Sequence, residues 1–189
     1  NLKIRKILIN RANFSIKKSD FKFINNFINQ KFSTKKIIIK NSNIFYKTQN
    51  DETISIFKIY NLDLFLNIKK FINQINANGK VYQIPFKLKW TGDFTENNSK
   101  KTTIEMSKLN LKMINDSVIK DSKYIANNKL IIGGSTLIFN YVIKDGLVIL
   151  KSSNSKLLND NIKYDGLIQL NPFDLILNID SKKFDYNKY

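Results

Sequence analysis

The feature that most constrains this chain is the regular alternation of apolar and polar residues. The clearest case is residues 161–180, NIKYDGLIQLNPFDLILNID, where large apolar residues fall on every second position on both sides of Asn171-Pro172. A period of two is the pattern of strands that bury one face and wet the other. Pro172 has a fixed φ and no backbone donor, which suits a turn better than a paired position. The stretch therefore predicts an antiparallel hairpin with one apolar face.

Similar segments recur every ten to fifteen residues or so along the chain, with turn signals such as Asn78-Gly79 and Asp145-Gly146 between them. Residues 53–68 alternate for longer than one ordinary strand, which predicts a bend or bulge near 58–61. Pro85 falls on the polar set of 81–90 and indicates an edge or a bulge. A slip in the alternation at Ser107-Lys108 predicts another bulge. The sequence thus predicts a mainly β fold: an extended, twisted antiparallel sheet, groove-like or open-barrel-like.

One segment changes period. Between residues 19 and 33, Phe21, Ile24, Phe27 or Ile28, and Phe32 recur at steps of three and four, after a Ser19-Asp20 start suited to an N-cap. This predicts one amphipathic helix near residues 19–33. We expect its apolar stripe to cover one open end of the sheet.

Length and composition bound the remaining possibilities. The 189 residues fit a single β-rich domain over 1–189, and 42% hydrophobic residues exclude a disordered chain. The apolar runs are too short to span a bilayer as a helix. Because residue 1 is Asn, we expect a fragment of a longer, repetitive protein.

The chemistry of the side chains argues against an enzyme. The sequence has no Cys and no His, which removes the usual nucleophiles, the usual zinc ligands and disulfides. The acids are scattered in turns and on polar strand positions, and Gly133-Gly134 lacks the pattern of a phosphate loop. We therefore expect no catalytic residues, no metal and no cofactor.

The net charge of +17 suggests a polyanionic partner when taken alone. However, only Arg5 and Arg11 are arginines, whereas guanidinium is the preferred group for phosphate forks and base edges. The many Lys, Asn, Ile, Phe and Tyr residues are those of AT-rich codons, and the lysines are dispersed. A basic nucleic-acid-binding domain is thus the less favoured alternative, and we expect no nucleic acid partner.

A large amount of one-sided strand with a single helix to cover it leaves two alternatives. The apolar faces can fold together as the solid core of a structural or adhesion-type β domain. They can instead line the apolar groove of a curved sheet. A C16 acyl chain in such a groove gains on the order of 12 kcal/mol, comparable with the burial of the strand side chains themselves. Energetics allow both arrangements.

Three segments resemble AsmA-like bacterial envelope proteins. They are 37–66, with IKNSNIFY, a polar turn and a strand ending in NLDLFL; 84–90, IPFKLKW; and 164–185, YDGLIQLNPFDLILNIDSKKFD. The resemblance covers scattered pieces of about half the chain. It implies a twisted β-groove, non-enzymatic, associated with phospholipid transport or outer-membrane assembly. It also implies a periplasmic location in a Gram-negative cell envelope, with an N-terminal inner-membrane anchor that this chain lacks.

The resemblance transfers no individual functional residue, so the expected binding site is a face. Its expected partners are phospholipid acyl chains, with lysines on the wet face near anionic head groups. The expected lipid-binding residues are the apolar members of three alternating segments: Leu62, Leu64, Leu66, Ile84, Phe86, Leu88, Ile168, Leu170, Leu175, Leu177 and Ile179.

Overall fold

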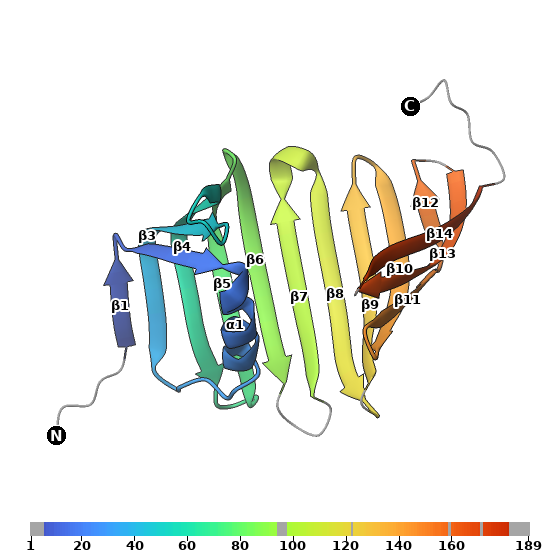
Figure 1. The fold of residues 1–189 in the computed structure, drawn as a ribbon. Coiled ribbons are helices and arrows are strands. Elements are labelled where there is room, and N and C mark those ends of the chain that lie inside the picture. The colour runs from blue at the N-terminus through green and yellow to red at the C-terminus, as the bar shows by residue number, and fades with distance from the viewer. Residues whose placement is uncertain (1–5, 94–97, 122, 159, 171, 182–189) are drawn as a thin grey trace. The chain divides into compact units, whose positions relative to one another are not determined.

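A computed structural model describes residues 6–93, 98–121, 123–158, 160–170 and 172–181. These residues form fourteen strands, one α-helix and two short 3-10 helices, so the predicted mainly β fold with a single helix is confirmed (Figure 1). The chain divides into two compact units, Asn1–Lys108 and Leu109–Tyr189. Each unit is described by itself below.

The N-terminal unit is a sheet whose strands mostly follow one another as antiparallel neighbours. Its strands are β1 (Lys6–Asn10), β2 (Asn13–Lys17), β3 (Lys36–Lys47), β4 (Thr53–Asn67), β5 (Ile72–Val81), β6 (Ile84–Asp93) and β7 (Ser99–Met106). Strands β3 to β7 pair in chain order. In contrast, β1 and β2 both run parallel to β3, one after the other along its length. The sheet is therefore mixed, where the sequence predicted antiparallel pairing throughout.

The helical segment between β2 and β3 is shorter than predicted. It consists of η1 (Lys18–Asp20) and α1 (Phe21–Ile28), and α1 lies over one face of the sheet (Figure 1). The chain leaves the helix before Phe32 because Asn73 of β5 holds the following loop. The Oδ1 atom of Asn73 accepts from the Phe32 amide at 2.9 Å, and its Nδ2 donates to the carbonyl of Gln30 at 2.7 Å. Phe32 thereby becomes a core residue instead of the last turn of a helix.

All of the buried strand residues in this unit lie on the face that α1 covers, which we call the Trp90 face. Phe32, Leu66 and Trp90 form its buried cluster, with Ile28 and Leu64 packed against them. The ring centroids of Phe32 and Trp90 lie 6.1 Å apart. Trp90 also lies over Gly92, where a Cβ would come within 2.5 Å of the indole. The helix and the loop after it thus seal this part of the face.

The predicted bulge near 58–61 is confirmed, because the β4–β5 register shifts between Ile59 and Asn61. The turn predicted at Asn78-Gly79 is wrong, since both residues lie inside β5. Gly79 is required there by the bulge: a Cβ would come within 2.1 Å of the Lys58 carbonyl oxygen. The β5–β6 turn is instead made by Tyr82 and Gln83, both at positive φ.

Pro85 sits near the start of β6, opposite Lys80 of β5. The ladder between β6 and β7 runs from Lys87 to Gly92 and does not reach Pro85. Its missing amide therefore leaves no gap in the β6–β7 ladder, although β6 lies between β5 and β7 and not at the predicted edge.

The C-terminal unit is a second meander of strands. Its strands are β8 (Leu111–Lys120), β9 (Lys123–Ile132), β10 (Ser135–Lys144), β11 (Leu147–Ser152), β12 (Ser155–Leu157), β13 (Asp160–Leu170) and β14 (Phe173–Ser181). The predicted Asp145-Gly146 turn and the predicted hairpin in 161–180 are both confirmed. The bulge predicted at Ser107-Lys108 is wrong, because η2 (Ser107–Leu109) separates β7 from β8.

Strands β11 and β12 act as two pieces of one strand between β10 and β13. Both pieces pair with both neighbours, and the chain breaks the ladder at Ser153-Asn154. The hydroxyl of Ser155, 1% exposed, accepts from the Ile138 amide at 2.9 Å and lies 2.9 Å from the Ile138 carbonyl. A buried side chain thus replaces the hydrogen bonds that the break removes from the ladder.

Candidate apolar binding face

The candidate site is one face of the C-terminal sheet, which we call the Leu177 face. Residues that are paired across adjacent strands share a face. One row on this face runs from Tyr124 of β9 to Leu175 of β14 through Ile143, Val148 and Ile168. The next row runs from Ala126 to Leu177 through Tyr141, Leu150 and Gly166. Apart from Gly166, these two rows are therefore apolar or aromatic across the strands from β9 to β14.

This face is the inner side of a curved sheet. The buried strand residues of the unit all lie on it: Asn115, Ser117, Ala126, Asn128, Ser135, Val148, Ser155, Ile162 and Gly166. The ring centroids of Phe139 and Tyr164 lie 6.3 Å apart, although the β11–β12 strand separates β10 from β13. Side chains from strands that are not neighbours meet in this way where the sheet bends toward them.

The apolar side chains that β14 contributes to this inner face are accessible to solvent. Leu175, Leu177 and Ile179 are 51%, 47% and 65% exposed. Leu177 lies against Gly166 of β13, where a Cβ would come within 3.1 Å of the Leu177 side chain and 2.8 Å of the Ile176 carbonyl. From Leu111 onward, the described residues contain strands and turns but no helix that would cover them. The apolar side chains of Leu175, Leu177 and Ile179 are therefore exposed to solvent.

A small polar group lies within this face. The Nδ2 atom of Asn115 donates to Oδ1 of Asn128 at 2.7 Å and to the Tyr141 hydroxyl at 3.4 Å. Tyr141 stacks on Tyr124 with ring centroids 6.0 Å apart. Burial, reinforced by Tyr124, raises the pKa of the Tyr141 phenol, and burial also raises the pKa of Tyr164. Both phenols are neutral at physiological pH, so the face carries hydrogen-bonding groups without charge.

The opposite face is mixed. Its polar row contains Asn127, Asn140, Lys151, Asp165 and Asn178, and Asn178 donates to Asp165 at 3.1 Å. An apolar row lies beside it and ends at Ile149, Leu167 and Ile176, of which Ile176 is 54% exposed. Only the Leu177 face combines apolar rows with inward curvature.

The residues expected to bind lipid divide between the two units. Leu62, Leu64, Leu66, Ile84, Phe86 and Leu88 all fall on the Trp90 face of the N-terminal unit. Leu66 is buried there against Phe32, and Leu64 and Leu88 pack on the same cluster. Ile168, Leu175, Leu177 and Ile179 fall on the Leu177 face, and Leu170 pairs with Phe173.

Sequence reasoning missed the middle of the face. Tyr141, Val148 and Leu150 lie in the middle of the face but are not among the residues that the sequence predicts to bind lipid. The alternation of Val148 and Leu150 with Ile149 was the available signal. Nothing in the sequence indicated the polar pair Asn115–Asn128. Its two members lie on different strands, and asparagine is also a common residue of ordinary turns.

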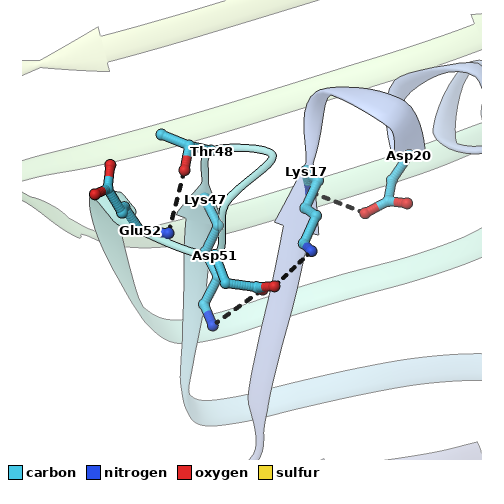
Figure 2. Close-up of polar contacts among 6 residues, drawn as sticks. All are labelled: Lys17, Asp20, Lys47, Thr48, Asp51 and Glu52. Carbon is cyan, nitrogen blue, oxygen red and sulfur yellow. Dashed lines mark hydrogen bonds and ion pairs between the residues drawn. The ribbon is translucent and has the colours of Figure 1, made fainter.

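A small group of charged side chains around Asp51 serves the fold of the N-terminal unit (Figure 2). Asp51, in the β3–β4 turn, pairs with Lys17 at 2.9 Å and with Lys47 at 3.8 Å. Hydrogen bonding to Lys17 lowers the pKa of the Asp51 carboxyl. The Lys17 amide donates to Asp20 at 2.8 Å, which ties β2 to the start of the helical segment. The arrangement is an exposed clamp between β2 and the β3–β4 turn.

The described residues contain no group of three or more acidic side chains placed to hold a metal ion. None of their helices combines the length and the apolar character that a membrane crossing requires.

Comparisons with protein-family models, with curated proteins and with solved structures found no match for this chain. The geometry of the Leu177 face is therefore the main indication of function.

Proposed function

We propose that the chain is a non-enzymatic lipid-binding segment and that the Leu177 face of its C-terminal unit binds acyl chains. The observation that carries the proposal is the exposure of Leu175, Leu177 and Ile179 on the inner side of a curved sheet. Apolar side chains on an inner face are ordinarily buried by a second layer. Within each unit the described strands form one sheet and no second sheet faces it, so a ligand is the natural cover.

Magnitudes support an acyl chain as that ligand. Each methylene transferred from water gains about 0.8 kcal/mol, so a chain of sixteen carbons gains on the order of 12 kcal/mol before the cost of ordering it. The rows on the Leu177 face continue from strand to strand, which suits a long flexible chain better than a compact ring system. The neutral phenols and amides of Tyr141, Asn115 and Asn128 suit the ester groups of a phospholipid.

The wider setting of the proposal comes from the sequence resemblance to AsmA-like envelope proteins. In that setting the chain is part of a longer periplasmic protein that moves phospholipid or assists outer-membrane assembly. A transmembrane helix upstream, followed by further β units, would support this setting. Any other arrangement of the upstream sequence would restrict the proposal to acyl binding alone.

The direct test is acyl binding by the delipidated chain, measured with a fluorescent fatty acid and by mass spectrometry of co-purified lipid. Leu177→Ser should weaken binding by about tenfold, the effect of a lost side chain in an apolar site. Ile176→Ser is the matched control, because Ile176 is its neighbour on β14 with similar exposure on the opposite face. The proposal fails if the unmodified chain binds no acyl ligand, or if both substitutions have the same effect.

A further inference from the structure

The hairpin that joins β4 to β5 ends in a sequence unusual for an exposed turn. Residues 68–71 read IKKF, and Ile68 and Phe71 are 57% and 53% exposed. Exposed turns usually carry Gly, Asn or Asp, since these residues tolerate the backbone geometry and water. An apolar residue at each end of two lysines indicates a contact with something that is both apolar and anionic.

The backbone at the tip reinforces this reading. Phe71 has a φ of +52°, a conformation that a bulky aromatic residue rarely adopts. Such a cost is expected where the side chain serves a purpose that Asn or Gly would not. Phe71 lies at the tip of the hairpin and is not a member of the buried cluster of Phe32, Leu66 and Trp90.

Other segments bring more lysines to the same end of the N-terminal unit. The Lys31 ammonium, in the loop after α1, lies 5.4 Å from the centre of the Phe71 ring. Lys100 of β7 hydrogen-bonds to Asn29, the residue that ends α1. Four lysines from three segments therefore lie at this end of the unit, and Lys31 lies over the exposed ring. Asp93, opposite Ile72, is an acid at the base of the hairpin.

The opposite end of the same unit provides a contrast. There Lys17 and Lys47 are engaged by Asp51 (Figure 2). Lys69 and Lys70, in contrast, make no ion pair with any residue that the structure describes. Their charges remain available at the surface beside two exposed apolar side chains.

We propose that this end of the N-terminal unit, formed by Lys31, Ile68, Lys69, Lys70, Phe71 and Lys100, docks onto the surface of an anionic lipid bilayer. Apolar and aromatic side chains enter the boundary between head groups and acyl chains, while lysines remain at the level of the phosphates. Each lysine near an anionic leaflet strengthens the contact. The chemistry of the tip matches both layers of such an interface. Acyl binding at the Leu177 face does not depend on this contact, nor does the contact depend on it.

The test is sedimentation of the chain with vesicles of phosphatidylglycerol and, in parallel, of phosphatidylcholine alone. The chain should bind the anionic vesicles, and added salt should weaken that binding. Replacing Lys69 and Lys70 together with Gln should weaken it roughly tenfold. Phe71→Asn should also weaken it, and because Asn accepts positive φ this variant should fold at least as well as the parent.

Tyr82→Asn is the matched control. Tyr82 is also an exposed aromatic residue at positive φ in a hairpin tip of the same unit, with 68% exposure, and it lies at the other end of β5. This substitution should leave vesicle binding unchanged. Equal loss in the two Asn variants, no binding to phosphatidylglycerol, or equal binding to both lipids would overturn the proposal. So would tighter binding to a DNA oligonucleotide than to vesicles, with no effect of Phe71→Asn on either.

Discussion

In the N-terminal unit the apolar face of the sheet lies under α1 and Phe32, whereas in the C-terminal unit the corresponding strands leave Leu175, Leu177 and Ile179 in contact with water. Both faces arise from the same alternation and both belong to single-layer sheets. The difference is one inserted segment, residues 18–35, which crosses the face before β3 begins. A cover supplied by the chain turns an apolar face into a core, and without that cover the apolar face stays accessible to solvent.

The cover of the N-terminal unit leaves a pocket open. Between α1 and the sheet lies a pocket of about 350 Å³ that is lined by Ile16, Phe21, Ile24, Ile44, Tyr46 and Phe57. No residue of α1 is fully buried, and Phe23 is 72% exposed. The seal thus depends mainly on the loop after the helix, where Asn73 holds Phe32 in place.

The comparison predicts that truncating an apolar side chain to Ala lowers the free energy of unfolding far more on the covered Trp90 face than on the open Leu177 face. Trp90→Ala should reduce the free energy of unfolding by about 3–5 kcal/mol, because it opens a cavity beneath Phe32. Leu177→Ala should cost under about 1.5 kcal/mol, since nearly half of that side chain already meets water. Urea unfolding followed by far-UV circular dichroism measures both. Similar losses in the two variants would mean that the Leu177 face is covered in solution.

The two units also share a device, and a pair of substitutions compares it. Ser42, fully buried, accepts from the Ala12 amide at 3.0 Å and donates to the Lys40 carbonyl at 2.8 Å, at the gap between β1 and β2. Ser155 does the same at the gap between β11 and β12. Ser42→Ala and Ser155→Ala should each cost about 1–2 kcal/mol. Exposed Ser153→Ala is the control, and faster hydrogen exchange at the Ile138 amide is the local signature for Ser155→Ala.

The smallest expected effect concerns the clamp at Asp51, which has no counterpart among the ion pairs described in the C-terminal unit. Because Lys17 lowers the pKa of Asp51 in the folded state, its contribution to stability is present above the pKa of a free aspartate. The contribution is lost as the pH falls through the lowered pKa. In Lys17→Gln, an NMR titration should show the Asp51 pKa moving back up. An unchanged pKa would assign the shift to Lys47 instead.

The sequence was sufficient to predict the mainly β fold, the faces of the most regular strands and the single helix, because these follow from periodicity. It also located the bulge near 58–61 and the hairpin of 161–180. It did not reveal that Gly79 faces the Lys58 carbonyl, since that contact depends on a partner about twenty residues away. The Asn78-Gly79 pair therefore resembled a turn, although both residues lie in β5 opposite the bulge of β4.

The predicted end of the helix is wrong for the same kind of reason. Helical spacing continues to Phe32, but a buried amide from β5 captures the backbone first. The candidate face shows the same limit. Alternation indicated which residues share a face, and only the curvature and the position of α1 distinguish a covered face from an accessible one.

The path of the chain through the N-terminal unit has a consequence for how it folds. Strands β3 to β7 pair with their neighbours in sequence, and such local contacts form early. The pairing of β2 with β3 joins residues thirty positions apart through α1 and requires a long crossover to close. The meander should therefore assemble first and the crossover dock last. For that interval the Trp90 face is as open as the Leu177 face remains, so the folding chain exposes two apolar faces, whereas the folded chain exposes one.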